Sequence, residues 1–114
     1  MKTILFAEGL LAPVLSRHKK ITLRKYRSGA HDFIEGEFIE GRFADGETTL
    51  TLRLLADTEI VEAGKISDIV AREDGFRNAH DMLVRMRRYY PDFGPATQVA
   101  IVRFELAENS EKVA

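Results

Sequence analysis

The stretch Arg17-His18-Lys19-Lys20-Ile21-Thr22-Leu23-Arg24 carries more information about the fold than any other part of the chain. From position 20 onward, apolar and polar residues alternate, which is the pattern of a β-strand with one face in the core. Ile21 and Leu23 are expected to face that core. Thr22 and Arg24 would share the opposite face, which places a hydroxyl and a guanidinium two residues apart on one strand.

The same stretch opens a strongly basic segment. Between Gly9 and Ala30 there is no acidic residue, whereas six of the chain's 17 lysines and arginines fall within these limits. The formal net charge of the whole chain is −1 at pH 7, so the basic segment belongs to an otherwise acidic protein. A local cluster of this kind attracts phosphate-bearing or other anionic partners. The alternative is that long basic side chains only keep an exposed strand in contact with water.

The first half of the chain is predicted to be mostly β-structure. Alternation and turn residues predict strands at residues 2–7, 20–26, 36–43, 48–55 and 57–63. Between the first two of these strands, apolar residues recur at helical spacing over residues 8–15, and Pro13 limits that segment to a short helix or kinked turn. The pair Asp45-Gly46 is a strong signal for a hairpin turn.

The second half changes to helical periodicity and then returns to a strand. Ser67 is suited to cap one helix and Gly75 to end it. Asn78 can cap a longer helix that ends before Pro91. Residues 97–106 form the most strongly apolar strand of the chain and are expected to lie centrally in the sheet. The pattern predicts an α+β fold: a β-barrel of about five to six mostly antiparallel strands with about three short helices at its ends.

Length and composition limit what the protein can be. The 114 residues suit one domain, expected to cover residues 1–108, with a frayed polar tail at 109–114. There is no cysteine for disulfide, zinc or redox chemistry, and His18, His31 and His80 are too widely spaced for a common metal site. No apolar run is long enough to cross a membrane or to form the core of a signal peptide. We therefore expect a cytoplasmic protein without metal or cofactor.

The opening stretch resembles the signature of the ASCH family, Gly-x-Lys-x-x-Thr-x-Arg. Lys19, Thr22 and Arg24 match three of its four fixed positions, and Arg17 stands at the position of the glycine. The later Asp-Gly-Phe element at residues 74–76, the helix that ends before a proline and the final strand are also similar to this family. The resemblance extends from about residue 6 to residue 106.

The resemblance implies a barrel of the PUA-like type with a cleft lined by the signature strand, and a protein that acts on RNA or modified nucleosides. On this reading the ligand or RNA is bound by a set of basic and aromatic side chains from one segment: Arg17, Lys20, Arg24 and Tyr26. Tyr26 follows the basic strand, where an aromatic ring can stack on a base.

The resemblance also implies an alternative, because small bacterial members include an amidohydrolase that deacetylates N(4)-acetylcytidine. Its catalytic roles would fall here on Lys19, Thr22 and Asp74. A third possibility is metal-independent cleavage of RNA by the same basic cluster.

The roles within the catalytic set depend on the protonation of Lys19. A threonine hydroxyl becomes a nucleophile only when a neighbour takes its proton, and lysine does so only when its ammonium form is disfavoured. The nearby cations act in that direction. An acid at Asp74, or at the adjacent Glu73, would stabilise the ammonium form and make Lys19 an electrostatic partner for an anion instead. Arg17 also replaces a residue suited to a left-handed turn, so the loop that presents Lys19 is open to change.

Overall fold

The structure is a computed structural model, and it describes residues 1–7, 9–44 and 46–107. The predicted tail at 109–114 and Asp45 of the predicted turn lie outside the described residues. In chain order the elements are β1 (Thr3–Phe6), α1 (Leu11–Leu15), β2 (Ile21–Lys25), β3 (Phe38–Phe43), β4 (Thr49–Leu54), β5 (Glu59–Glu62), the 3-10 helix η1 (Ala63–Lys65), α2 (Asp68–Glu73), α3 (Ala79–Tyr89) and β6 (Gln98–Leu106). The predicted sequence of strands and helices is confirmed.

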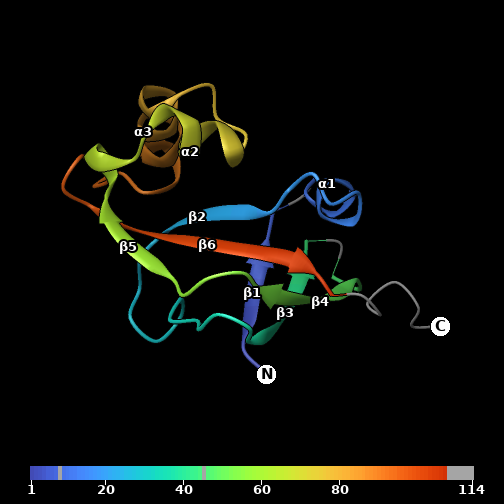
Figure 1. The fold of residues 1–114 in the computed structure, drawn as a ribbon. Helices are drawn as coiled ribbons and strands as arrows, with labels where there is room; N and C mark the ends of the chain where they lie inside the picture. The colour runs from blue at the N-terminus through green and yellow to red at the C-terminus, as the bar shows by residue number, and fades with distance from the viewer. Residues whose placement is uncertain (8, 45, 108–114) are drawn as a thin grey trace.

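The strands form one curled sheet in the order β1-β3-β4-β6-β2, with β5 also paired to β6 (Figure 1). Only β1 and β3 run parallel, and the other pairs are antiparallel. As expected, β6 is central: β2 pairs along one of its edges, while β5 and β4 share the other. The observed architecture is therefore the predicted α+β fold, with the strands curled into a half-barrel.

Two hydrophobic cores lie on opposite faces of β6 and β2. The larger core fills the inside of the barrel and includes Phe6, Ile39, Leu52, Val102 and Phe104, among others. The second core lies between the same two strands and the helices, and includes Ile21, Leu23, Met82, Phe93 and Ile101. Helices α2 and α3 lie together at one end of the molecule, with α1 at the other end (Figure 1).

This arrangement corrects one expectation about β2. Ile21 and Leu23 face a core as predicted, the one that the helices cover, but the opposite face of the strand is also covered at Thr22. Thr22 is only 3% exposed, and its partner across the ladder is Val102 of the barrel core. The alternating pattern suggested a half-buried strand because it cannot show that a second core covers the polar face.

The helix ends follow the predicted capping residues. The Ser67 hydroxyl accepts a hydrogen bond from the Val70 amide at 3.1 Å, and the Asn78 side chain accepts one from the Asp81 amide at 2.8 Å. Gly75 follows α2 with φ +106°, a conformation that favours glycine. These caps fix the end of α2, and with it the residue that follows the helix, Asp74.

Candidate functional site

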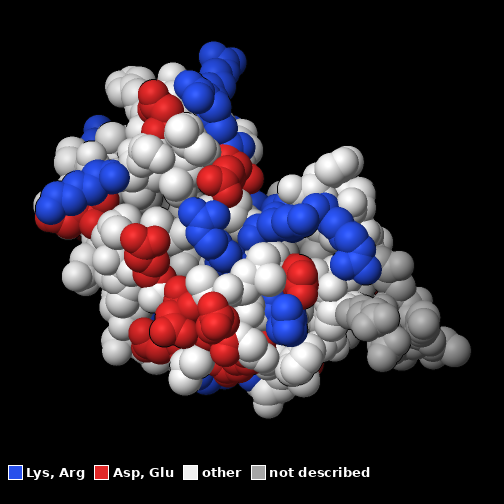
Figure 2. Space-filling view, in the orientation of Figure 1, with Lys and Arg blue, Asp and Glu red and all other residues white. Residues whose placement is uncertain are grey.

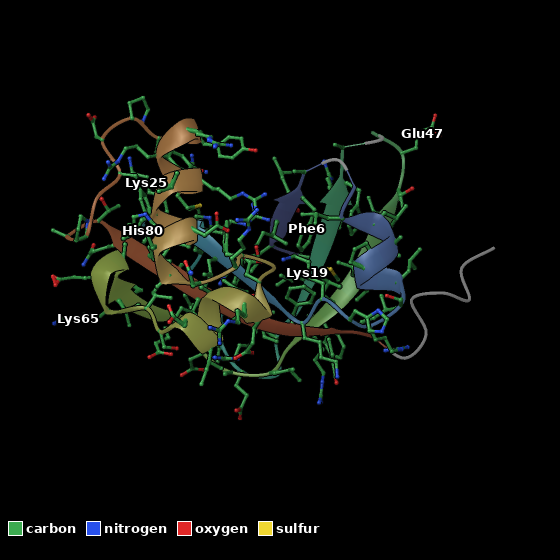
Figure 3. All side chains as sticks on the ribbon, turned by 90° about the horizontal axis from the view of Figure 1, so that it is seen from above. Phe6, Lys19, Lys25, Glu47, Lys65 and His80 are labelled. Atoms are coloured by element: carbon green, nitrogen blue, oxygen red, sulfur yellow. The ribbon has the colours of Figure 1, made fainter. Side chains whose placement is uncertain are left out.

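Lys19 occupies the turn that leads into β2. The amide groups of His18 and Lys19 both donate to the Pro13 carbonyl, at 3.1 and 3.0 Å, and this brings the turn back onto α1. Because Lys19 lies in the turn before the strand, the alternating direction of side chains along β2 does not apply to it. Its side chain points inward, and only 8% of the residue's surface is exposed. Figure 3 shows Lys19 and Phe6 between the α2–α3 pair on one side and α1 on the other.

Asp74 meets Lys19 from the end of α2. Its Oδ1 contacts the Lys19 ammonium, and its Oδ2 accepts a hydrogen bond from the Leu23 amide at 3.2 Å. Burial raises the pKa of the Asp74 carboxyl, and the charge of Lys19 opposes that shift. The Glu73 carboxylate instead forms an ion pair with the Arg103 guanidinium, at an N–O distance of 3.0 Å. The acid beside Lys19 is therefore Asp74, and this settles the choice between two neighbouring acids.

Thr22 and Arg24 form the second half of the cluster. The Arg24 Nε donates to the Thr22 hydroxyl oxygen at 2.9 Å, and the guanidinium carbon lies 5.3 Å from the centroid of the Phe6 ring. Burial lowers the pKa of Arg24, and the nearby charge of Asp74 opposes the shift. Within the described residues, no carboxylate forms an ion pair with Arg24. The strand thus holds a largely buried guanidinium whose charge has no direct counterion in that part of the chain.

Arg24 also lines a cleft of about 770 Å³. The walls come from β1, the end of β2, the loop at residues 27–31 and the residue after α3. The cationic lining residues are Lys2, Arg24, Lys25 and Arg27, and the aromatic ones are Tyr26, Tyr90 and His31. No aspartate or glutamate is among the described residues that line it. An open cavity of this size and charge suits a small anionic ligand or one unit of a larger one.

The loop that forms one wall of the cleft is held by several hydrogen bonds. The Asp32 carboxylate accepts from the Tyr26 hydroxyl at 2.8 Å and from the Gly29 amide at 2.7 Å. His31 Nδ1 accepts from the Arg27 amide at 3.3 Å, and the Thr58 hydroxyl donates to the His31 carbonyl. Burial, followed by the charges of two arginines, lowers the pKa of His31, which favours its neutral form.

Two of the predicted binding residues lie outside the lining of this cleft. Arg17 donates from its Nη1 to the Leu106 carbonyl at 3.0 Å, and Lys20 is exposed. Arg17 adopts φ 67°, the left-handed conformation that the signature glycine would supply. The turn therefore keeps the expected backbone shape despite the substitution. On the face shown in Figure 2, basic side chains form a band that runs toward α1, while acidic ones gather below it over β5.

The structure thus brings the predicted residues together in two groups, one at the start of β2 and the other along this strand. Lys19 contacts Asp74, Thr22 contacts Arg24, and Arg24 and Tyr26 both line the cleft. The residues that sequence reasoning missed include those of β1 and its neighbours, above all Phe6. Lys25 and Arg27 belong to the basic segment and could have been chosen from it. No sequence signal indicates Phe6, because only the fold brings β1 beside β2.

In the part of the chain that the structure describes, neither a metal site nor a membrane-spanning helix is found. In the described residues, no group of three or more His, Asp or Glu side chains is placed to hold a metal ion. Among the same residues, no helix has the length and apolar character needed to cross a bilayer.

Comparison with known proteins identifies the class of fold. No family model and no curated protein matches the sequence. Among solved structures, an ASCH domain from Lactobacillus crispatus JV V101 matches with a TM-score of 0.67 and 11% identity, over 83% of this chain and 68% of that one. A protein from Enterococcus faecalis V583, described by the family DUF984, matches with a TM-score of 0.69 and 16% identity, over 99% and 82% of the two chains.

A third match is the solution structure of a Pyrococcus furiosus protein, with a TM-score of 0.56 and 19% identity over 94% of this chain and 97% of that one. The protein therefore has the fold of an ASCH domain, as its signature strand predicted. At these identities the likeness establishes the fold, and the function has to be argued from the site.

Proposed function

We propose that this ASCH-fold protein binds RNA or a modified nucleotide in the cleft between β1 and β2. The observation that carries the proposal is a cleft lined by four cations and by no acid among the described residues, with Arg24 held in it. A largely buried guanidinium that forms no ion pair with the described residues is costly, and an oxyanion of the ligand would supply a direct partner charge. Arginine is also well shaped to hold a phosphate with two parallel hydrogen bonds.

Aromatic side chains at the same cleft favour a ligand that carries bases. Tyr26 and Tyr90 both contribute to its lining, and the Lys25 ammonium lies 5.3 Å from the centroid of the Tyr90 ring. Rings next to basic groups are the usual means of holding single-stranded nucleic acid, because every base offers a flat face for stacking. The Tyr26 hydroxyl is already bonded to Asp32, so its contribution to a ligand would come from the ring.

The test is a fluorescence titration of short single-stranded RNA at several salt concentrations. We expect the affinity to fall steeply as salt rises, because phosphate contacts release counterions. Arg24→Ala should weaken binding by about tenfold or more, since it removes a charge-assisted contact. Lys65→Ala is the matched control, because Lys65 of η1 is an exposed cation that pairs with Glu62 of β5. An affinity that stays flat across the salt series would contradict the proposal.

A second candidate is the deacetylation of N(4)-acetylcytidine. Its support is that Lys19 and Thr22 are both buried at the start of β2 and that Asp74 contacts Lys19 there. Two features oppose it. The Lys19 amine is already engaged in an ion pair with Asp74, and the Thr22 oxygen accepts a hydrogen bond from Arg24 and is almost fully buried.

Conversion of N(4)-acetylcytidine to cytidine by the pure protein decides this second candidate. Turnover that disappears in both Lys19→Ala and Thr22→Val would support it, with circular dichroism used to verify that the variants fold. Activity that survives Thr22→Val, or no turnover by the folded wild-type protein, would remove it.

A further inference from the structure

The cleft lies between two strand edges with which no other strand pairs in the described part of the chain. On β1, the Lys2 carbonyl accepts from the Glu40 amide of β3 at 2.8 Å. Main-chain groups of a strand alternate in direction, so those of Ile4 and Phe6 also point to β3. The amide and carbonyl groups of Thr3 and Leu5 therefore point the other way, toward the open edge.

The edge of β2 can be assigned in the same way. The Tyr26 amide donates to the Gln98 carbonyl of β6 at 2.9 Å, whereas the Leu23 amide donates away from β6, to Asp74. Lys25 has the same parity as Leu23, so its amide and carbonyl groups point to the open edge. Thr3, Leu5 and Lys25 all line the cleft. Main-chain donors and acceptors thus border it on two sides.

These groups suit a small flat partner better than an added strand. Strand addition needs a continuous row of free groups along an edge. On β2 that row is interrupted, because Asp74 already occupies the Leu23 amide, and the strand ends at Lys25. At the cleft, β2 thus offers the main-chain groups of one residue, Lys25, and β1 offers those of two, Thr3 and Leu5. These few donors and acceptors match the short row of polar groups at the edge of a heterocyclic base. The four cations at the same cleft suit the phosphate attached to such a base.

We infer that the cleft holds one unpaired nucleobase, whose hydrogen-bonding edge is recognised by the main-chain groups of Thr3, Leu5 and Lys25. Arg24 and its neighbouring cations bind the phosphate. This inference rests on the proposed function and adds to it a requirement, because the edge concerned is the Watson–Crick edge, which a base within a duplex already uses for pairing. A single strand or a mononucleotide can enter the cleft, and an intact duplex cannot present the edge.

The direct test follows the amide signals of the isotope-labelled protein by NMR during titration with each of the four ribonucleoside 5′-monophosphates. Ribose 5-phosphate, which has the phosphate and no base, is the control. We expect both kinds of ligand to shift the Arg24 Nε–H signal. Only the nucleotides should shift the amides of Thr3, Leu5 and Lys25 and slow their hydrogen exchange.

The outcomes separate the inference from the proposed function. If nucleotides and ribose 5-phosphate shift the same signals, the strand edges do not recognise the base, and the inference fails while anion binding stands. If no ligand shifts the Arg24 signal or the three amides, the proposed function fails as well.

A substitution can remove one of these main-chain donors. Lys25→Pro deletes the amide that points to the open edge and leaves the bonds to β6 intact, because proline is tolerated where a strand's N–H faces outward. Arg24 before it is already extended, as a residue before proline prefers. Lys25→Ala is the matched control, since it removes the same side chain and keeps the amide.

Relative to Lys25→Ala, we expect Lys25→Pro to bind the mononucleotides about tenfold more weakly and ribose 5-phosphate equally well. Thermal unfolding verifies that both variants fold. Equal nucleotide affinity of the two folded variants would overturn the inference.

Discussion

Arg24 is the residue at which the buried cluster meets the cleft. Its Nε is bonded to the Thr22 hydroxyl, its guanidinium lies over the Phe6 ring, and it lines the cavity. A guanidinium held on one edge and one face has fewer rotamers to lose when it binds an oxyanion, so less of the interaction energy is spent on ordering it. In this arrangement Thr22 is a positioning residue for Arg24.

We predict that Thr22→Val weakens RNA binding by about tenfold, the typical effect of losing a hydrogen bond to a charged group. Thr22→Ser keeps the hydroxyl and should retain most of the wild-type affinity. Titrations of both variants at one salt concentration measure this difference. Equal affinities of the valine and serine variants would show that the hydroxyl does not position Arg24.

Among the elements, the turn between α1 and β2 has a left-handed residue at its centre. Arg17 adopts φ 67°, which costs a non-glycine residue about 1–2 kcal/mol. Its side chain offsets part of that cost through the hydrogen bond to the Leu106 carbonyl. This compensation explains how the turn keeps its shape without the signature glycine.

The two effects can be separated by comparing two substitutions. Arg17→Ala removes the side-chain hydrogen bond and keeps the backbone strain. Arg17→Gly removes the hydrogen bond and also relieves the strain. We predict that the glycine variant is more stable than the alanine variant by about 1 kcal/mol, measured as the free energy of unfolding in urea. A glycine variant no more stable than the alanine variant would mean that the turn is not strained.

The loop at residues 27–31 gives a prediction about pH. The pKa of His31 is lowered in the folded protein by burial and by Arg24 and Arg27. In the unfolded chain the imidazole takes up a proton below about pH 6.5, and in the folded protein it does so only at lower pH. Its contribution to stability is therefore full above about pH 6.5 and is lost as the pH falls through the lowered pKa.

Thermal unfolding measured across this pH range tests the prediction. The wild-type protein should lose stability on acidification to a greater extent than His31→Asn, whose amide oxygen can still accept from the Arg27 amide. Parallel pH profiles for the two proteins would contradict it.

At the scale of the whole molecule, the central strand β6 belongs to both cores. Its residues Val102 and Phe104 face the barrel, while Val99 and Ile101 face the helices. Any loss of packing on one side thus acts on a strand that the other side also needs. We expect the helices and the barrel to unfold as one unit.

Met82→Ala tests this coupling from the helical side, since Met82 is fully buried in the second core. The substitution should cost about 2–5 kcal/mol. Tyrosine fluorescence and far-ultraviolet circular dichroism should report a single, coincident transition for the variant as for the wild type. Two separated transitions would show that the barrel folds without the helices.

The sequence predicted most of the elements and part of the site. Capping residues and alternation act locally, so Ser67, Asn78 and the strand containing Thr22 could be assigned without the structure. The burial of Thr22 could not, because alternation does not reveal what covers the polar face. The position of the cleft could not be predicted either, since it depends on how the sheet β1-β3-β4-β6-β2 curls to bring its two end strands to opposite sides of the cleft.

The hydrogen bonds around Asp32 have a consequence for the energetics of recognition. Because Tyr26 and Gly29 are tied to this carboxylate, the protein's own hydrogen bonds shape this wall of the cleft. A wall held in this way loses little main-chain entropy when a ligand binds, and association should not be slowed by a preceding rearrangement. For the proposed ligand, preorganisation of this kind favours a fast association rate.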